Sequence, residues 1–231
     1  MMKSGFDASA LADMFAQATT KQGEALRKAA SEATLKALQG RELTLDNIRK
    51  ALKQVADATS AGAAKNLMPN VDVEALLAKA VAGMDAAVLQ TVQAHRKALQ
   101  QFVDQGIGLQ DEQMKSALAN VEKMDDMFFK AIGSSAKSAD AALQGPWKQV
   151  LDSMKMKGTD TGLQAASSIE QLTSQAETVL REGRSAGMRN AQTLMKGYAA
   201  VVSGVLIGMS DALQPQQAAE PKAATKARKR G

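Results

Sequence analysis

The chain has 231 residues, a net charge of +5 and no cysteine. This length is sufficient for one or two domains with a sizeable core. The absence of cysteine excludes disulfides and thiolate metal sites, which is typical of a protein of the reducing cytosol. Aromatic residues make up only 3% of the chain, whereas helix-favouring Ala, Leu, Gln, Lys and Glu are common. We therefore expect an all-α protein.

Two helices are predicted in the first part of the chain. The first covers about residues 9–39, and Gly23 favours an interruption in its middle because glycine is a poor helix former. The second follows a predicted cap at Thr44 and fades before the turn at residues 69–70.

The most regular pattern lies at residues 73–102, where Asp72 is placed to cap a long helix. Residues at steps of three or four line up on one face of this helix. That face contains Leu77, Val81, Met84, Val88, Val92, His95, Leu99 and Phe102.

A short glycine-containing link leads from this helix to the next, whose apolar stripe runs from Met114 to Ile132. Asp111 and Glu112 fall in its first turn, where negative charge suits the helix dipole. Because a short link favours antiparallel neighbours, we expect elongated amphipathic helices that form an antiparallel hairpin over residues 72–132, within a bundle.

Glycine, serine and proline interrupt the pattern between residues 133 and 158 and predict an irregular connector. The predicted domains are therefore an N-terminal helical region at 1–132 and a C-terminal helical region at 159–213. Residues 214–231 lack apolar periodicity and predict a disordered basic tail.

No residue cluster indicates catalysis. His95 is the only histidine, so neither a zinc site nor a base for a serine nucleophile is supplied by the pattern. The sequence contains no G-x-S-x-G elbow and no G-x-x-x-x-G-K phosphate loop. We interpret His95 as a packing residue and expect no enzyme activity, metal or cofactor.

The segment from Gly204 to Gly208 has the small-xxx-small pattern that allows close helix packing. The surrounding apolar run, Gly197 to Met209, is 13 residues long. Since about 20 residues are needed to span a bilayer, we expect tight packing in a helical bundle and no transmembrane segment.

Most of the net positive charge lies in the tail, where Glu220 is the single acidic residue. Such a run is suited to sequence-independent contact with DNA phosphates, and equally to a solubilising role or to docking of an acidic partner. The residues concerned are Lys222, Lys226, Arg228, Lys229 and Arg230.

The apolar stripes allow two interpretations, because the hydrophobic effect favours packing against another helix and against any other apolar surface. In the first, the stripes cover one another in a slender bundle. In the second, they also adsorb to an external surface, for which the 13 flexible methionines are well suited.

Three stretches resemble the phasins, which coat polyhydroxyalkanoate storage granules in bacteria. They are Ala-Leu-Leu-Ala-Lys-Ala-Val-Ala at 75–82, Ala-Ala-Ser-Ser-Ile-Glu-Gln-Leu at 165–172 and Pro-Lys-Ala-Ala at 221–224. The likeness extends over residues 9–213 and the tail. It implies a non-enzymatic, self-associating cytoplasmic protein on a polymer inclusion, and some phasins have basic tails that touch DNA. The predicted connector at 133–158 departs from the continuous helix pair of the family.

We therefore expect a surface-coat protein that adsorbs to polyester granules and forms a homo-oligomer. The alternative is a nucleoid-associated or scaffold protein whose bundle stays closed and whose tail binds DNA or an acidic partner. The first hypothesis places the hydrophobic-surface contacts at Leu77, Val81, Met84, Val88, Leu118, Val121, Phe128, Val202 and Leu206.

Overall fold

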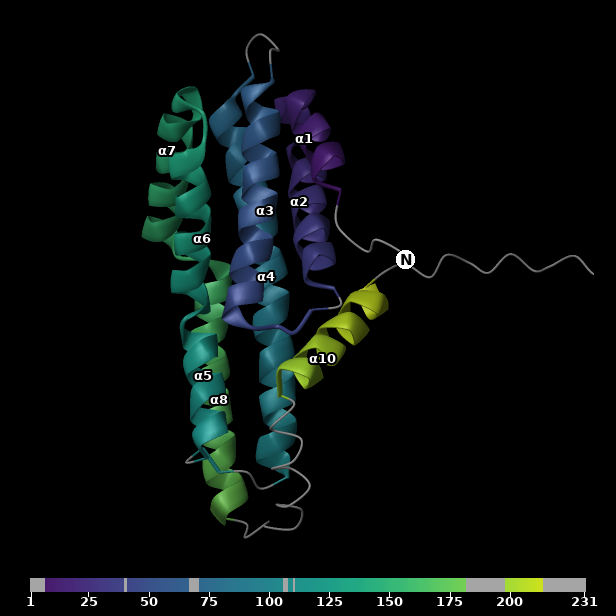
Figure 1. Cartoon of the computed structure of the whole chain (residues 1–231). Helices are drawn as coiled ribbons and strands as arrows, with labels where there is room; N and C mark the ends of the chain where they lie inside the picture. The colour runs from purple at the N-terminus through teal and green to yellow at the C-terminus, as the bar shows by residue number, and fades with distance from the viewer. Residues whose placement is uncertain are drawn as a thin grey trace, which may run out of the picture.

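A computed structural model describes residues 7–39, 41–66, 71–105, 108–109, 111–181 and 198–213. Every regular element in these ranges is a helix, which confirms the all-α prediction. Figure 1 shows an elongated bundle in which α4 extends through both the upper and the lower part. The elements are α1 (Ala8–Ala16), the 3₁₀ helix η1 (Thr20–Gln22), α2 (Gly23–Leu38), α3 (Leu45–Ala64), α4 (Val73–Asp104), α5 (Glu112–Glu122), α6 (Met124–Ser138), α7 (Ala141–Lys157), α8 (Asp160–Arg181) and α10 (Tyr198–Leu213).

Side-chain caps begin several helices at the predicted positions. Thr44 Oγ1 accepts a hydrogen bond from the Asn47 N–H at 3.2 Å, and the Asp72 carboxylate accepts one from the Ala75 N–H at 3.0 Å. Asp111 immediately precedes α5 and caps it in the same way. These bonds satisfy backbone donors that the first turn of a helix leaves unpaired. The caps predicted at Thr44 and Asp72 are therefore confirmed.

The predicted interruption of the first helix is also confirmed. The helix expected over residues 9–39 is divided into α1 and α2, which are separated by η1, and α2 begins at Gly23. Asn66 Nδ2 lies 3.0 Å from the carbonyl oxygens of Phe15 and Ala18 and donates to these acceptors at the end of α1. The turn after α1 is thus tied to the end of α3.

Helix α4 is covered along its length, chiefly by α2 and α8 and also by α10 and α3. It packs less extensively against α5, its expected partner in the hairpin. By length and composition α4 is apolar enough to cross a membrane, but 61% of the relevant stretch is buried inside the bundle. Its hydrophobicity is therefore that of a central core helix.

Two glycines allow neighbouring helices to approach closely. A Cβ atom on Gly83 of α4 would lie 2.1 Å from the Arg27 carbonyl oxygen in α2. A Cβ atom on Gly62 of α3 would lie 2.2 Å from the Ala12 carbonyl oxygen in α1. Both obstacles are backbone atoms, so the α2–α4 and α1–α3 contacts depend on the missing side chains.

The prediction of an irregular connector at residues 133–158 is wrong, because two helices occupy most of this segment. Helix α6 continues through Gly133 to Ser138, and α7 begins at Ala141 and includes Pro146. Trp147 is fully buried, and its indole Nε1 donates a 3.0 Å hydrogen bond to Ser60 Oγ in α3. The burial of this large side chain outweighs the local helix-breaking tendency of glycine and proline.

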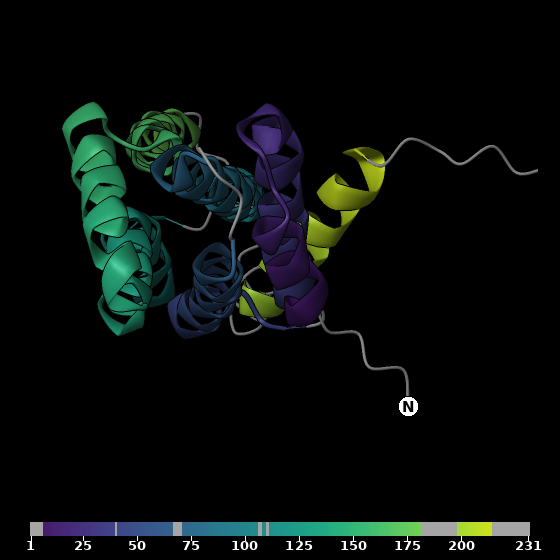
Figure 2. The same cartoon turned by 90° about the horizontal axis from the view of Figure 1, so that it is seen from above.

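The apolar stripe expected in one helix from Met114 to Ile132 is shared between α5 and α6, which meet at Lys123. Met114, Phe128 and Ile132 are all fully buried. They belong to one continuous core that extends from α1 to α10 and is viewed from above in Figure 2.

We predict that Gly83→Ala lowers the free energy of unfolding by about 1–3 kcal/mol, because the added methyl group overpacks the α2–α4 contact. The matched change Gly208→Ala in α10, where a Cβ atom meets nothing within 4 Å, should be neutral or stabilise by up to about 1 kcal/mol. Urea unfolding followed by the fluorescence of Trp147, the single tryptophan, measures both. Equal effects of the two substitutions would contradict the packing described.

Candidate functional site

Helix α10 is the most apolar surface element of the described structure and crosses the side of the bundle obliquely (Figure 1). It contains no charged residue before Asp211. Its inner face places Val202 and Leu206 in the core. Its outer face consists of exposed residues that recur at helical spacing, namely Ala200, Gly204, Ile207 and Gly208.

Few polar contacts attach α10 to the bundle. Ser203 Oγ accepts a 3.2 Å hydrogen bond from the Leu43 N–H in the segment before α3. The same oxygen lies 2.8 Å from the Arg41 carbonyl and 2.9 Å from the Ala199 carbonyl, so its single proton serves one of them at a time. These bonds fix the middle of α10 against the α2–α3 connection.

The first residue of α10 contacts the only histidine. The Tyr198 hydroxyl lies 2.6 Å from His95 Nδ1 in α4, and the tyrosine ring also packs against Phe102 with ring centroids 6.3 Å apart. His95 is 2% exposed, which confirms the interpretation of His95 as a packing residue. The sequence pattern did not indicate its tyrosine partner, which is about a hundred residues away in the chain.

Burial keeps this pair uncharged near neutral pH. Desolvation lowers the pKa of His95 to about 4, against the smaller opposing effect of hydrogen bonding to the Leu43 backbone. Nε2 has no hydrogen bond of normal geometry among the described residues. Desolvation also raises the pKa of Tyr198. The neutral histidine and the neutral phenol form one hydrogen bond, which orients the two side chains where they pack together.

A second buried polar cluster joins α8 to α4. The Asp85 carboxylate of α4 accepts hydrogen bonds from the backbone N–H groups of Asp160 and Thr161, at 3.0 and 3.3 Å. The Thr161 hydroxyl donates to the Asp85 carbonyl at 3.1 Å. Desolvation raises the pKa of Asp85, while the bonds from Thr161 and Asp160 oppose the shift. This carboxylate is a tertiary cap for the N-terminus of α8.

Thr159 supplies the local cap of α8. Its Oγ1 accepts a 2.8 Å hydrogen bond from the Gly162 N–H and donates to the Asp125 carboxylate of α6. Gly158 precedes it with a positive φ of 79°, a conformation that glycine adopts without strain. The junction therefore holds α4, α6 and α8 together by hydrogen bonds and has a structural role.

Both clusters join helices to one another. The first pairs the Tyr198 hydroxyl with His95, which is 2% exposed, and the second pairs the Asp85 and Asp125 carboxylates with groups at the start of α8. No group of three or more His, Asp or Glu residues suited to a metal ion occurs in the part of the chain that the structure describes. The outer face of α10 offers apolar contact.

The structure places most of the predicted surface contacts inside the bundle. Leu118 is partly buried, and the other eight are buried: Leu77, Val81, Met84, Val88, Val121, Phe128, Val202 and Leu206. They line the interior between several helices and do not form one outer face. The basic residues predicted to contact DNA lie outside the described residues.

The expected tight packing at Gly204 and Gly208 is not found among the described residues, where a Cβ atom at either glycine would meet nothing within 4 Å. The small residues instead form the outer face of α10, next to Ile207, which is 41% exposed. A complete lack of charge from Tyr198 to Ser210 is the sequence signal that indicates this surface.

Comparison with known protein families gives one match. A family of unknown function, DUF6781, matches residues 1–215. The chain belongs to this family. No match was found among curated proteins or among solved structures.

The DUF6781 match includes α1 to α10 and ends before Lys222, the first basic residue of the tail. The helical bundle, with α10, is therefore the part of the chain that the family describes. The family description assigns no function, so the resemblance to phasins stays a prediction.

We predict that acid weakens the fold through His95. The pKa of His95 is lower in the folded state than in the unfolded state, so protons bind the unfolded state more tightly. The free energy of unfolding therefore keeps its full value above the unfolded pKa, near 6.5, and decreases as the pH falls from 6.5 toward 4. From pH 7 to 5 the loss is about 2 kcal/mol. His95→Asn, which keeps a polar atom near the Nδ1 position, should remove this component.

The measurement is urea unfolding of both proteins at a series of pH values. The raised pKa of Asp85 acts in the opposite direction, but this group is present in both proteins and cancels in their difference. Parallel pH profiles would show that His95 does not titrate on unfolding.

Proposed function

We propose that this protein is a non-catalytic surface-coat protein that adsorbs to a hydrophobic polyester surface, of the polyhydroxyalkanoate type, through α10. The observation that carries the proposal is the position of α10. Its inner apolar face covers α4, while its outer face, with Ile207 41% exposed, carries no charged residue from Ala200 to Gly208. The resemblance to phasins supports the choice of polyester and a cytoplasmic location on granules.

The energies of attachment favour α10 as the element that moves. Among the described side chains of α10, Val202 and Leu206 are nearly completely buried, which contributes about 2 kcal/mol each. The bonds of Ser203 and Tyr198 add roughly 1 kcal/mol apiece, and Val201, Val205 and Met209 pack partly buried against the core. Detaching α10 therefore costs on the order of 6 kcal/mol or more, which burial of its apolar side chains against an external surface must offset.

Opening the bundle at α4 would cost more. Leu77, Val81, Met84 and Val88 are fully buried there, each contributing about 2 kcal/mol, and α2 and α8 would both have to leave. The proposal therefore retains Val202 and Leu206 as surface contacts, adds Ile207, and assigns the remaining predicted contacts to the core.

Self-association is part of the proposal. Gly204 and Gly208 leave a shallow, uncharged strip on α10, which allows close approach of a second copy once the helices lie side by side on a surface. The alternative, binding of DNA or an acidic partner by the tail, is supported by the charge of residues 222–230 alone. The DUF6781 match ends before that segment.

We predict that Ile207→Asp reduces co-sedimentation with polyester particles at least about tenfold, because a carboxylate at the interface must be desolvated. The control is Leu163→Asp in α8, at an apolar side chain that is 69% exposed but lies outside α10. Circular dichroism verifies that both variants stay helical. If Ile207→Asp and the unchanged protein sediment equally, α10 is not the adsorbing element.

A further inference from the structure

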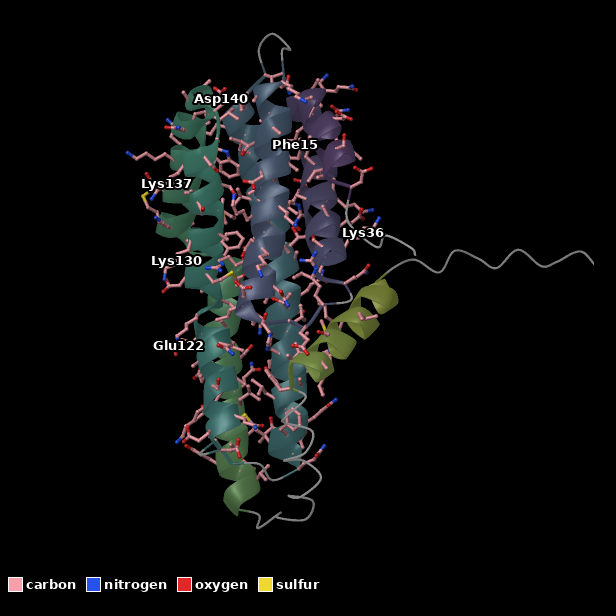
Figure 3. All side chains as sticks on the ribbon, viewed as in Figure 1. Phe15, Lys36, Glu122, Lys130, Lys137 and Asp140 are labelled. Carbon is pink, nitrogen blue, oxygen red and sulfur yellow. The ribbon has the colours of Figure 1, made fainter. Side chains whose placement is uncertain are left out.

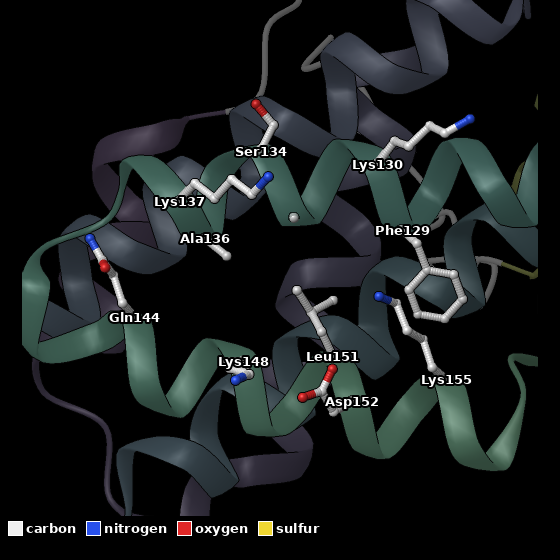
Figure 4. A pocket seen from close by; sticks show the side chains of 11 residues that line it. Phe129, Lys130, Ser134, Ala136, Lys137, Gln144, Lys148, Leu151, Asp152 and Lys155 are labelled. Carbon is white, nitrogen blue, oxygen red and sulfur yellow. The ribbon is translucent and has the colours of Figure 1, made fainter.

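Helices α6 and α7 form a groove on the side of the bundle away from α10. Its volume is about 630 Å³, and Figure 4 shows its lining side chains between the two helices. Phe129, Ala136 and Leu151 provide an apolar floor. The rim carries Lys130, Lys137, Lys148 and Lys155, against the single acid Asp152.

Each of the two helices carries two of the lysines at the same spacing. Lys130 and Lys137 are seven residues apart on α6, and Lys148 and Lys155 are seven apart on α7. Seven residues are two helical turns, or about 10 Å along the axis. Because the helices are antiparallel, Lys137 and Lys148 lie closer to the connecting turn and form one pair across the groove, and Lys130 and Lys155 form a second pair farther from the turn (Figure 4).

This positive charge has no ion-pair partner in the described structure. None of the four lysines forms an ion pair there, whereas Lys50 and Lys53 on α3 pair with Asp46 and Asp57. Lys155 lies over the Phe129 ring, 5.8 Å from its centroid. Figure 3 shows Lys130 and Lys137 at the outer edge of the bundle. The groove is thus a local basic surface, although basic and acidic residues nearly balance outside the tail.

Gly133 keeps the centre of the groove open. It lies within α6, where glycine costs about 1 kcal/mol relative to alanine, yet a Cβ atom there would meet nothing within 4 Å. Packing inside the chain therefore does not require this glycine. Its absent side chain leaves space between the two lysine pairs, at the level where a bound backbone would approach.

We propose that this groove binds an acidic amphipathic helix of a partner protein, with carboxylates seven residues apart and apolar residues between them. A third helix laid along α6 and α7 places one carboxylate at each lysine pair and its apolar residues on Phe129 and Leu151. The two separated pairs match a ligand with anionic groups about 10 Å apart. A single phosphate or a fatty acid has its charge at one point and would leave one pair unused.

The test measures binding of a fluorescently labelled 21-residue synthetic peptide by anisotropy. The peptide carries Glu at every seventh position with Leu and Ala on the same face, and a control peptide of equal composition scatters its Glu residues around the helix. The full-length protein should bind the first peptide at least about tenfold more tightly than the second, and binding should weaken with salt.

Matched variants locate the site. Lys130→Gln with Lys155→Gln should weaken binding about tenfold, and Gly133→Leu should do the same by filling the groove. Lys50→Gln with Lys53→Gln removes the same charge on α3 and should leave binding unchanged. Circular dichroism and Trp147 fluorescence confirm that each variant is folded.

Three results would overturn the proposal. The first is equal affinity for both peptides, which indicates unspecific charge attraction. The second is equal binding by the groove and α3 variants. The third is lysine-dependent binding to anionic phosphatidylglycerol vesicles without peptide binding, which assigns the groove to a membrane surface. None of these results depends on α10 or on polyester adsorption.

Discussion

The need to cover α4 determines the arrangement of the other helices. This helix has 32 residues with apolar side chains on several sides, and the hydrophobic effect favours a neighbour along each of them. Each neighbour is held in a different way. Helix α2 approaches closely at Gly83, α8 is capped by Asp85, and α10 rests on His95 through Tyr198.

The bundle has two different kinds of exposed surface, one on α10 and one on the α6–α7 pair. Helix α10 packs mainly against α4 and carries no charged residue from Tyr198 to Ser210, which suits exchange between α4 and an external apolar surface. The α6–α7 pair is anchored by Trp147 and presents a fixed groove lined by lysines. Figures 1 and 2 show α10 and the α6–α7 pair on opposite sides of the bundle, so occupation of one surface leaves the other accessible.

Local signals in the sequence predicted the fold better than the surfaces. Caps and periodicity located α3 and α4, because both arise from neighbouring residues. The connector prediction failed since the burial of Trp147 against α3, a tertiary effect, overrides the local influence of Pro146. The pattern at Gly204 and Gly208 did not reveal that no other described helix packs against them. The lysine spacing is visible in the sequence, but its pairing across the groove depends on the antiparallel packing of α6 and α7.

Hydrogen–deuterium exchange with and without polyester particles tests most directly whether α10 is the detachable cover of α4. In solution, the amides of α10 should exchange faster than those of α2 and α4, because less buried area holds them. On particles, α10 should become protected while α2 and α4 keep their slow exchange. Unchanged exchange in α10 on particles, or loss of protection in α2 and α4, would contradict the account.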